Sequence, residues 1–200
     1  MMNTTTHSFS SRSALLCWQV STRLIRQCVL ALLVVLSVSS CSTLTSTPQV
    51  SASSEAPWAL LPINNLSQTA QADSQAQTFV ETHLRARGVQ RVDIYRPLKP
   101  VSLRGLLDVG AEIDDATQWA QSKGYRYAVT GTVHEWQYKG GTDKEPAVGV
   151  SLKLIDLSSN RVLWQANAAR TGWGYANLPA VANKVVSDLL QQIQLDAVVR

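Results

Sequence analysis

An apolar stretch near the N-terminus, from Cys28 to Val38, constrains the rest of the chain more than any other feature. Arginines at positions 12, 23 and 26 precede it, two serines and a cysteine follow it, and no acidic residue occurs before Glu55. A basic region, a short apolar run and small residues, in that order, are typical of a signal peptide. The run is shorter than the roughly 20 apolar residues that a helix needs to span a bilayer. We therefore expect residues 1–40 to be a signal peptide and the folded part to follow it.

The end of this stretch, Val38-Ser39-Ser40-Cys41, resembles the lipobox of bacterial lipoproteins. The resemblance implies cleavage before Cys41 and acylation of its thiol, and several acyl chains hold a protein stably on a membrane. Ser42 follows the cysteine, and this resemblance then implies an outer-membrane lipoprotein on the periplasmic face. The alternative is an uncleaved N-terminal membrane anchor.

The charge balance changes when the signal peptide is removed. The whole chain has 18 basic and 14 acidic residues, but the part after position 40 keeps 15 basic and 14 acidic residues. This nearly neutral part has no dense cluster of Lys and Arg, so nucleic acid is not expected as a partner. Cys17 and Cys28 leave with the signal peptide, and acylated Cys41 would leave the domain without a free thiol.

The segment 41–56 is rich in Ser and Thr and has few large apolar side chains. Such a composition buries too little surface to offset the entropy of ordering, which predicts a flexible tether after the lipidated cysteine. Its typical reach would be about 20 Å.

The segment 57–200 is expected to form a single α/β domain. Hydrophobic periodicity predicts strands at 58–63, 89–95, 125–138, 147–157 and 161–169, and helices at 73–87, 113–123 and 178–193. A Gly-rich loop and a short turn with Asn160 join the last three strands, which predicts a three-stranded antiparallel meander. The fold class is therefore a mixed sheet with this meander, helices packed on it, and a C-terminal amphipathic helix.

Residues that could support catalysis or bind a metal are sparse after position 40. His83 and His134 do not lie in a metal-ligand spacing with Cys, Asp or Glu. Adjacent Asp114 and Asp115 would point roughly 100° apart on a helix, and carboxylates near a helix start favour its dipole. We therefore expect no catalytic residue, no metal and no cofactor, and a chain that is not an enzyme.

Trp173 lies between two glycines and is followed, after Gly174, by Tyr175, between a strand and the last helix. This is a poor position for core packing, and the amphipathic rings of Trp and Tyr favour membrane interfaces. Two interpretations stay open here: a loop that faces a membrane or a subunit, and an ordinary buried tryptophan. The other aromatic residues in apolar patterns are expected in or near the core: Trp58, Trp119 and Trp164.

Several segments resemble the PelC family of outer-membrane lipoproteins, which serve secretion of the Pel exopolysaccharide. The resemblance rests on Leu-Pro-Ile-Asn-Asn at 61–65, Ala-Val-Thr-Gly-Thr-Val at 128–133, and the strand-turn-strand from Asp156 to Trp164. It covers about 58–195. More distantly similar cores occur in the curli secretion lipoprotein CsgG, the penicillin-binding-protein activator LpoB and the N-terminal domain of TolB.

The PelC resemblance implies a non-enzymatic, lipid-anchored component of exopolysaccharide export, forming a homo-oligomeric ring beneath a β-barrel porin. It also implies a membrane-facing tryptophan, which Trp173 matches by position, with Tyr175 beside it. An acidic surface would guide a positively charged polysaccharide, and the densest acidic stretch comprises Asp108, Glu112, Asp114 and Asp115. These four residues also suit a solvated helix start.

The resemblance to LpoB implies an alternative function, a periplasmic lipoprotein that activates a cell-wall synthase. Such activators carry longer disordered linkers, whereas the expected tether is short for crossing the periplasm.

Overall fold

The computed structural model describes residues 26, 42–97, 109–141, 144–173 and 176–196. The chain divides into two compact units, Met1–Ser39 and Ser40–Arg200, and the second contains all the elements below. Three residues singled out by the sequence, Cys41, Asp108 and Tyr175, lie outside the described residues. The elements are β1 Ser42–Ser46, β2 Val50–Ser53, β3 Trp58–Asn65, α2 Ala72–Ala86, β4 Val92–Ile94, α3 Val109–Ser122, β5 Tyr127–Tyr138, β6 Pro146–Asp156, β7 Arg161–Thr171, α4 Leu178–Leu190 and β8 Ile193–Asp196.

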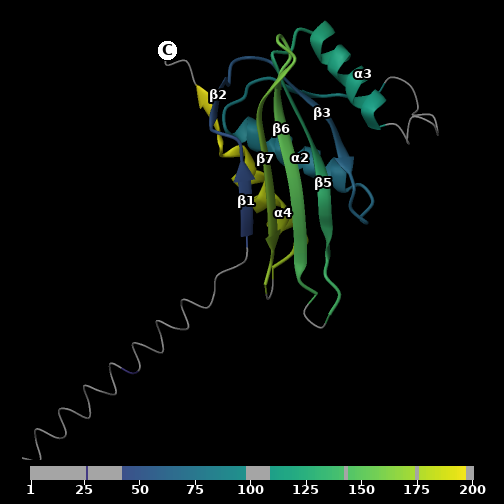
Figure 1. The fold of residues 1–200 in the computed structure, drawn as a ribbon, viewed down its shortest axis with the longest axis vertical. Coiled ribbons are helices and arrows are strands. Elements are labelled where there is room, and N and C mark those ends of the chain that lie inside the picture. The colour runs from purple at the N-terminus through teal and green to yellow at the C-terminus, as the bar shows by residue number, and fades with distance from the viewer. Residues whose placement is uncertain (1–25, 27–41, 98–108, 142–143, 174–175, 197–200) are drawn as a thin grey trace, which may run out of the picture. The chain divides into compact units, whose positions relative to one another are not determined.

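A mixed six-stranded sheet in the order β1-β7-β6-β5-β3-β4 forms the centre of the domain (Figure 1). β5, β6 and β7 pair antiparallel, which confirms the predicted meander. β3 lies parallel to both β4 and β5. Parallel neighbours need crossover connections, and α2 and α3 lie in the two connections from β3 to β4 and from β4 to β5. The α/β class predicted from periodicity is therefore confirmed.

The helices cover the two faces of the sheet unequally. α2 and α4 pack on one face and enclose the larger core, which contains the buried rings of Trp58, Trp136 and Trp164. α3 lies on the other face over one end of the sheet, where Ala116 and Ala120 pack against Leu61 and Leu157 (Figure 1). The described strands therefore leave much of this second face without a helix.

α4 begins where its sequence predicts. The Asn177 side chain accepts a hydrogen bond from the backbone N–H of Ala180 at 2.9 Å, and Pro179 lies in the first turn. Its buried positions follow the predicted apolar stripe: Val181, Ala182, Val185, Val186, Leu189 and Leu190. The helix ends at Leu190, however, and Ile193 begins β8 rather than a further helical turn.

The structure corrects the expectation of a flexible tether. Within 41–56, β1 pairs antiparallel with β7 and β2 pairs parallel with β8. Every residue of β1 is exposed, so this strand is held by backbone hydrogen bonds to a sheet edge and not by apolar burial. An argument from composition considers only the burial of side chains. It therefore does not predict a strand that is held by backbone hydrogen bonds.

Gly131 on β5 tests the close packing of the sheet. A Cβ atom there would lie 2.2 Å from the Ser151 carbonyl oxygen and 2.8 Å from a Leu152 methyl carbon. Gly131→Ala should lower the free energy of unfolding by roughly 1–3 kcal/mol because backbone must move. Gly140→Ala, with no atom within 4 Å of the new Cβ, should change it by less than about 0.5 kcal/mol. Denaturant unfolding of both variants measures the difference, and equal stabilities would contradict this account of β5.

Candidate functional site

One end of the sheet gathers the chain segments that could meet a membrane. β5 ends there at Tyr138, β6 begins at Pro146, and β7 ends at Thr171. β1 begins at the same end, since Ser42 pairs with Arg170. We call this the anchor end, because Cys41 precedes Ser42 and consecutive Cα atoms lie about 3.8 Å apart. An acyl group on Cys41 would therefore be attached directly to this end of the sheet.

Trp173 projects from the anchor end. Its side chain is 74% exposed, so the structure favours an outward-facing ring over a core tryptophan. The backbone around it is held closely. The Gly172 N–H donates to the Pro146 carbonyl at 2.8 Å, and the Ala176 N–H donates to the Trp173 carbonyl at 3.3 Å. A Cβ on Gly172 would approach Pro146, Ala176 and Val181 within 3 Å, so glycine is required for this packing.

Tyr138 and Leu44 are among the other exposed apolar side chains, and neither was identified from the sequence. Tyr138 at the anchor end is 49% exposed, and its hydroxyl accepts a hydrogen bond from the Leu178 N–H at 3.0 Å. Leu44 on β1 is 50% exposed. Leu44 is the one leucine in a Ser/Thr-rich segment, which was a usable signal. Tyr138 gave none, because tyrosine is an ordinary strand residue.

The acidic residues of α3 lie toward the opposite end of the sheet. Asp114 and Asp115 are exposed and Glu112 is half-buried. The C-terminal part of α3 is fixed by Gln121, which donates to the Leu157 carbonyl just after β6. The length of β6, roughly 30 Å, separates the two ends. The structure therefore does not bring the described acidic residues together with Trp173 (Figure 1).

A stack of aromatic rings holds α3 on the sheet. Trp119 of α3 lies between Tyr95 and Tyr125, with ring centroids 5.4 Å and 5.2 Å away. The Arg91 guanidinium lies 5.0 Å from the centre of the Tyr125 ring. The Tyr125 hydroxyl donates to Asp93 at 2.5 Å, and Arg91 donates to the same carboxylate at 3.1 Å. The stack thus links α3 to the strand β4 through an ion pair and a hydrogen bond.

The surroundings of this cluster shift several pKa values, among them those of Asp93 and Tyr95. The pKa of Asp93 is lowered, chiefly by the hydrogen bond from Tyr125 and then by Arg91. The pKa of Tyr95 is raised by burial first, and then by the negative charges of Asp115 and Glu112. The carboxylates of α3 therefore act on the side chains at the β4 edge, even though they point largely into solvent.

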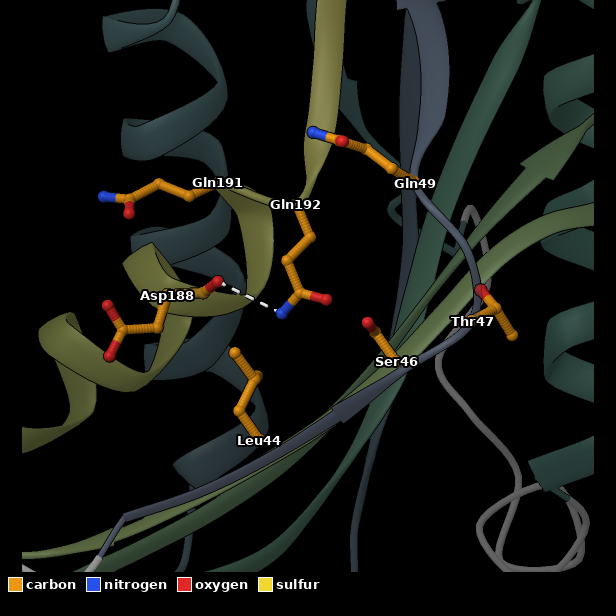
Figure 2. Close-up of a pocket in the computed structure, with 7 residues that line it drawn as sticks. All are labelled: Leu44, Ser46, Thr47, Gln49, Asp188, Gln191 and Gln192. Carbon is orange, nitrogen blue, oxygen red and sulfur yellow. Dashed lines mark hydrogen bonds between the residues drawn. The ribbon is translucent and has the colours of Figure 1, made fainter.

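A small pocket lies between the β1–β2 connection and the C-terminal end of α4 (Figure 2). Its volume is about 450 Å³. Asp188 pairs with Lys184 at 2.5 Å and with Arg170 at 3.6 Å, and Gln192 donates to its backbone carbonyl. Because Asp188 is already paired, the pocket offers mainly amides and hydroxyls. Its lining residues are Leu44, Ser46, Thr47, Gln49, Asp188, Gln191 and Gln192.

The two histidines after position 40 have polar neighbours from other elements. A His83 ring nitrogen lies 2.9 Å from the Asn183 side-chain oxygen, which joins α2 to α4. A His134 ring nitrogen lies 2.5 Å from the Ser151 hydroxyl. Within the described ranges, no cluster of three or more His, Cys, Asp or Glu residues could hold a metal ion. In the same ranges, no helix has the length and apolarity needed to cross a bilayer.

Comparison with known proteins finds similarity among solved structures. No model of a protein family matches the chain, and no curated protein matches it significantly. Among solved structures, the chain is similar to the PelC dodecamer from Paraburkholderia phytofirmans, with 32% identity and a TM-score of 0.67. That match covers 78% of this chain and 100% of the other.

Two weaker similarities are too low to support a conclusion about function. Lipoprotein GNA1162 from Neisseria meningitidis has 17% identity and a TM-score of 0.47, over 68% of this chain and 96% of that chain. The C-terminal domain of LpoB from Salmonella enterica has 13% identity and a TM-score of 0.40, over 59% and 84% respectively.

The hydrogen bond from Tyr125 makes the pKa of Asp93 testable. Tyr125→Phe should raise that pKa toward its ordinary value of 3.8, measured by a carboxyl-carbon NMR titration. A carboxyl group whose pKa is lowered in the folded state stabilises the protein at pH values above its ordinary pKa. This contribution is lost as the pH falls through the folded-state pKa. Tyr125→Phe should therefore weaken the acid dependence of stability. Tyr127→Phe is the control, and an unchanged Asp93 pKa in Tyr125→Phe would refute the assignment.

Proposed function

The chain belongs to the PelC family, and from that premise we propose that it is a non-enzymatic, lipid-anchored component of exopolysaccharide export across the outer membrane. In this proposal it forms a ring beneath a β-barrel porin, on the periplasmic face. The observation that carries the proposal is the 32% identity over all of a PelC chain. That relative is a dodecamer, which supports a homo-oligomer of this chain.

The position of the anchor end supports a defined orientation on the membrane. β1 starts at Ser42 and pairs at once with β7, so acylated Cys41 would place this end against the bilayer. The exposed ring of Trp173 then lies at the level of the lipid headgroups, where tryptophan is favoured. Tyr175 is proposed to share this environment, and Tyr138 offers a second amphipathic ring at the same end.

The acidic residues would then face away from the membrane, toward the incoming polymer. Glu112, Asp114 and Asp115 lie on α3 toward the far end, and Asp108 precedes that helix in the sequence. Repeated around a ring, these carboxylates would form a negative field at the periplasmic mouth. Such a field raises the local concentration of a positively charged polysaccharide, although the net charge of each subunit is small.

The alternative function, activation of a cell-wall synthase in the manner of LpoB, has less support. An outer-membrane activator must extend across the periplasm on a long linker. Here β1 begins one residue after Cys41 and β2 follows within four residues of its end. The segment after Cys41 is therefore part of the folded domain and does not serve as a free linker. The structural similarity to LpoB is also too weak to argue from.

Replacing the exposed carboxylates of α3 tests whether they guide the polymer. Asp114→Asn combined with Asp115→Asn should reduce secreted polysaccharide severalfold while leaving the amount of the lipoprotein and its oligomer unchanged. The matched control is Glu55→Gln combined with Asp73→Asn, which removes two carboxylates outside α3. Secretion is quantified per cell in a strain that depends on this protein. Normal secretion in the α3 variant would exclude the guiding role, whereas normal secretion after deletion of the protein would exclude the export function.

Photo-crosslinking tests the orientation. A photoreactive amino acid at position 173 should crosslink to lipid in cells, whereas the same group at Val162 should not. Val162 is a suitable control because it is 54% exposed and lies just after the start of β7, at the opposite end of the sheet. Labelling with palmitate, present in wild type and absent in Cys41→Ser, checks that the anchor is in place. Equal lipid crosslinking from both positions would contradict the proposed orientation.

A further inference from the structure

The pocket between β1 and the C-terminal end of α4 lies away from the acidic helix. β1 is one edge strand of the sheet, whereas Trp119 of α3 packs against Tyr95, which follows β4 at the other edge. The pocket volume of about 450 Å³ falls within the roughly 300–1,000 Å³ of small-molecule sites. The pocket is therefore distinct from the surface proposed to guide the polymer, and its size suits a small ligand or one segment of a longer chain.

Three side chains from two parts of the chain point toward one space in this pocket. Figure 2 shows the Gln192 amide between the hydroxyl of Ser46 and the end of the Leu44 side chain. The Gln192 amide is oriented without a ligand, because its Nε2 donates to the Asp188 carbonyl at 3.4 Å. An amide group has two N–H donors and an oxygen that accepts. One donor and the acceptor of Gln192 are therefore left to face a ligand.

Other polar groups of the pocket also have hydrogen-bonding capacity to spare. Among the described residues, the Ser46 hydroxyl and the Gln49 amide have no hydrogen-bond partner. The Gln191 Nε2 donates to the Ser187 hydroxyl at 3.1 Å, which leaves the Gln191 amide oxygen as an acceptor. The pocket thus offers both donors and acceptors to a ligand.

The charge and apolar area of the pocket exclude several classes of ligand. Asp188 is the charged residue of the lining, and its carboxylate pairs with Lys184 at 2.5 Å and with Arg170 at 3.6 Å. Figure 2 shows this carboxylate turned away from the space beside Gln192. A free ion would therefore meet no unpaired opposite charge among the lining residues. Leu44 is the one large apolar side chain of the lining, which is too little for a lipid or another apolar ligand.

We infer that this pocket binds an uncharged sugar unit of a polysaccharide. Neighbouring hydroxyls of a sugar ring both donate and accept, which matches the amides of Gln192 and Gln49 and the hydroxyl of Ser46. The C–H groups on the face of the ring would contact Leu44. A peptide is a poorer occupant, because a strand edge binds a peptide through backbone groups, whereas this pocket presents side chains.

The inference goes beyond the proposed export role and does not depend on it. The carboxylates of α3 would attract a positively charged polymer from a distance, whereas the pocket would recognise uncharged units in direct contact. Both an exported polysaccharide and the glycan strands of the cell wall offer sugar rings with free hydroxyls. The two sources share the chemistry that the pocket recognises, and the crosslinking experiment separates them.

Saturation-transfer NMR tests the pocket with defined sugars. The lipidated protein, extracted from membranes and placed in nanodiscs, is mixed with maltotetraose or chitotetraose, which are both uncharged. Wild type should transfer saturation to at least one of these sugars. Ser46→Ala combined with Gln49→Ala should reduce that signal about fivefold or more, because hydrogen bonds to the sugar are lost. No signal in wild type, or an equal signal in this variant, would overturn the inference.

The matched control is Ser42→Ala combined with Gln68→Ala. These two residues are exposed and lie outside the pocket, one in β1 and the other in the loop after β3, so this variant should bind as wild type does. Both variants should keep the circular dichroism spectrum of wild type, because all the side chains replaced are exposed. A signal from acetyl-trialanine amide with none from either sugar would overturn the inference, since the occupant would then be a peptide.

Photo-crosslinking in cells identifies the source of the sugar. A photoreactive amino acid at position 49 should crosslink to polysaccharide, whereas the same group at position 68 should not. A crosslinked product that a muramidase shortens would identify cell-wall glycan, and a product that resists the enzyme would identify the exported polymer; either supports the inference. No crosslink from position 49, or crosslinks to protein or lipid alone, would overturn it and leave the export function standing.

Discussion

Pairing of β1 with β7 is the constraint on which the arrangement of this domain depends. Ser42 lies opposite Arg170, and the chain has no spare length between Cys41 and the sheet. A lipid on Cys41 would therefore fix not only the location of the domain but also its orientation. The strands run away from the anchor end, so the far end and α3 point away from any surface to which that end is attached. Without β1, the same domain on a flexible segment could present any face to the membrane.

The second constraint is the aromatic stack at the β4 edge. β4 has three residues, and α3 contributes Trp119 between two tyrosines to cover it. The hydrogen bond from Tyr125 to Asp93 and the Arg91 ion pair join the stack to the strand. The carboxylates of α3 are therefore carried by a helix whose C-terminal part is fixed on the sheet, while the side chains of Asp114 and Asp115 stay exposed to solvent. A guiding surface needs this combination, because a negative field is useful when its position is fixed and its charges are not neutralised.

Periodicity predicted the elements that bury a long row of apolar side chains and missed the short strands that bury one or none. α4 repeats Val181, Val185 and Leu189 on one face, and β6 alternates from Val148 to Leu154, so both could be found from residue type. β1 buries nothing, and its pairing depends on backbone groups that every residue carries. β2 and β8 have four residues each and fully bury only Ala52 and Ile193, which is too short a pattern to show a period. For Trp173 the sequence left two environments open. The exposure of Trp173 decides between them. The backbone next to it is held by the packing of Gly172 against Pro146 and Val181, and residue type does not reveal such contacts between separate segments.

Trp173 has a property that a sequence cannot display. The interior of the subunit does not explain it, because its large apolar ring is left in solvent. It lies at the end of the strands where β1 begins, which is the end to which an acyl group on Cys41 would be attached. If lipid contacts this end, the faces that run along the strands are left for contacts with other molecules, so membrane contact and further binding would use different surfaces of the domain.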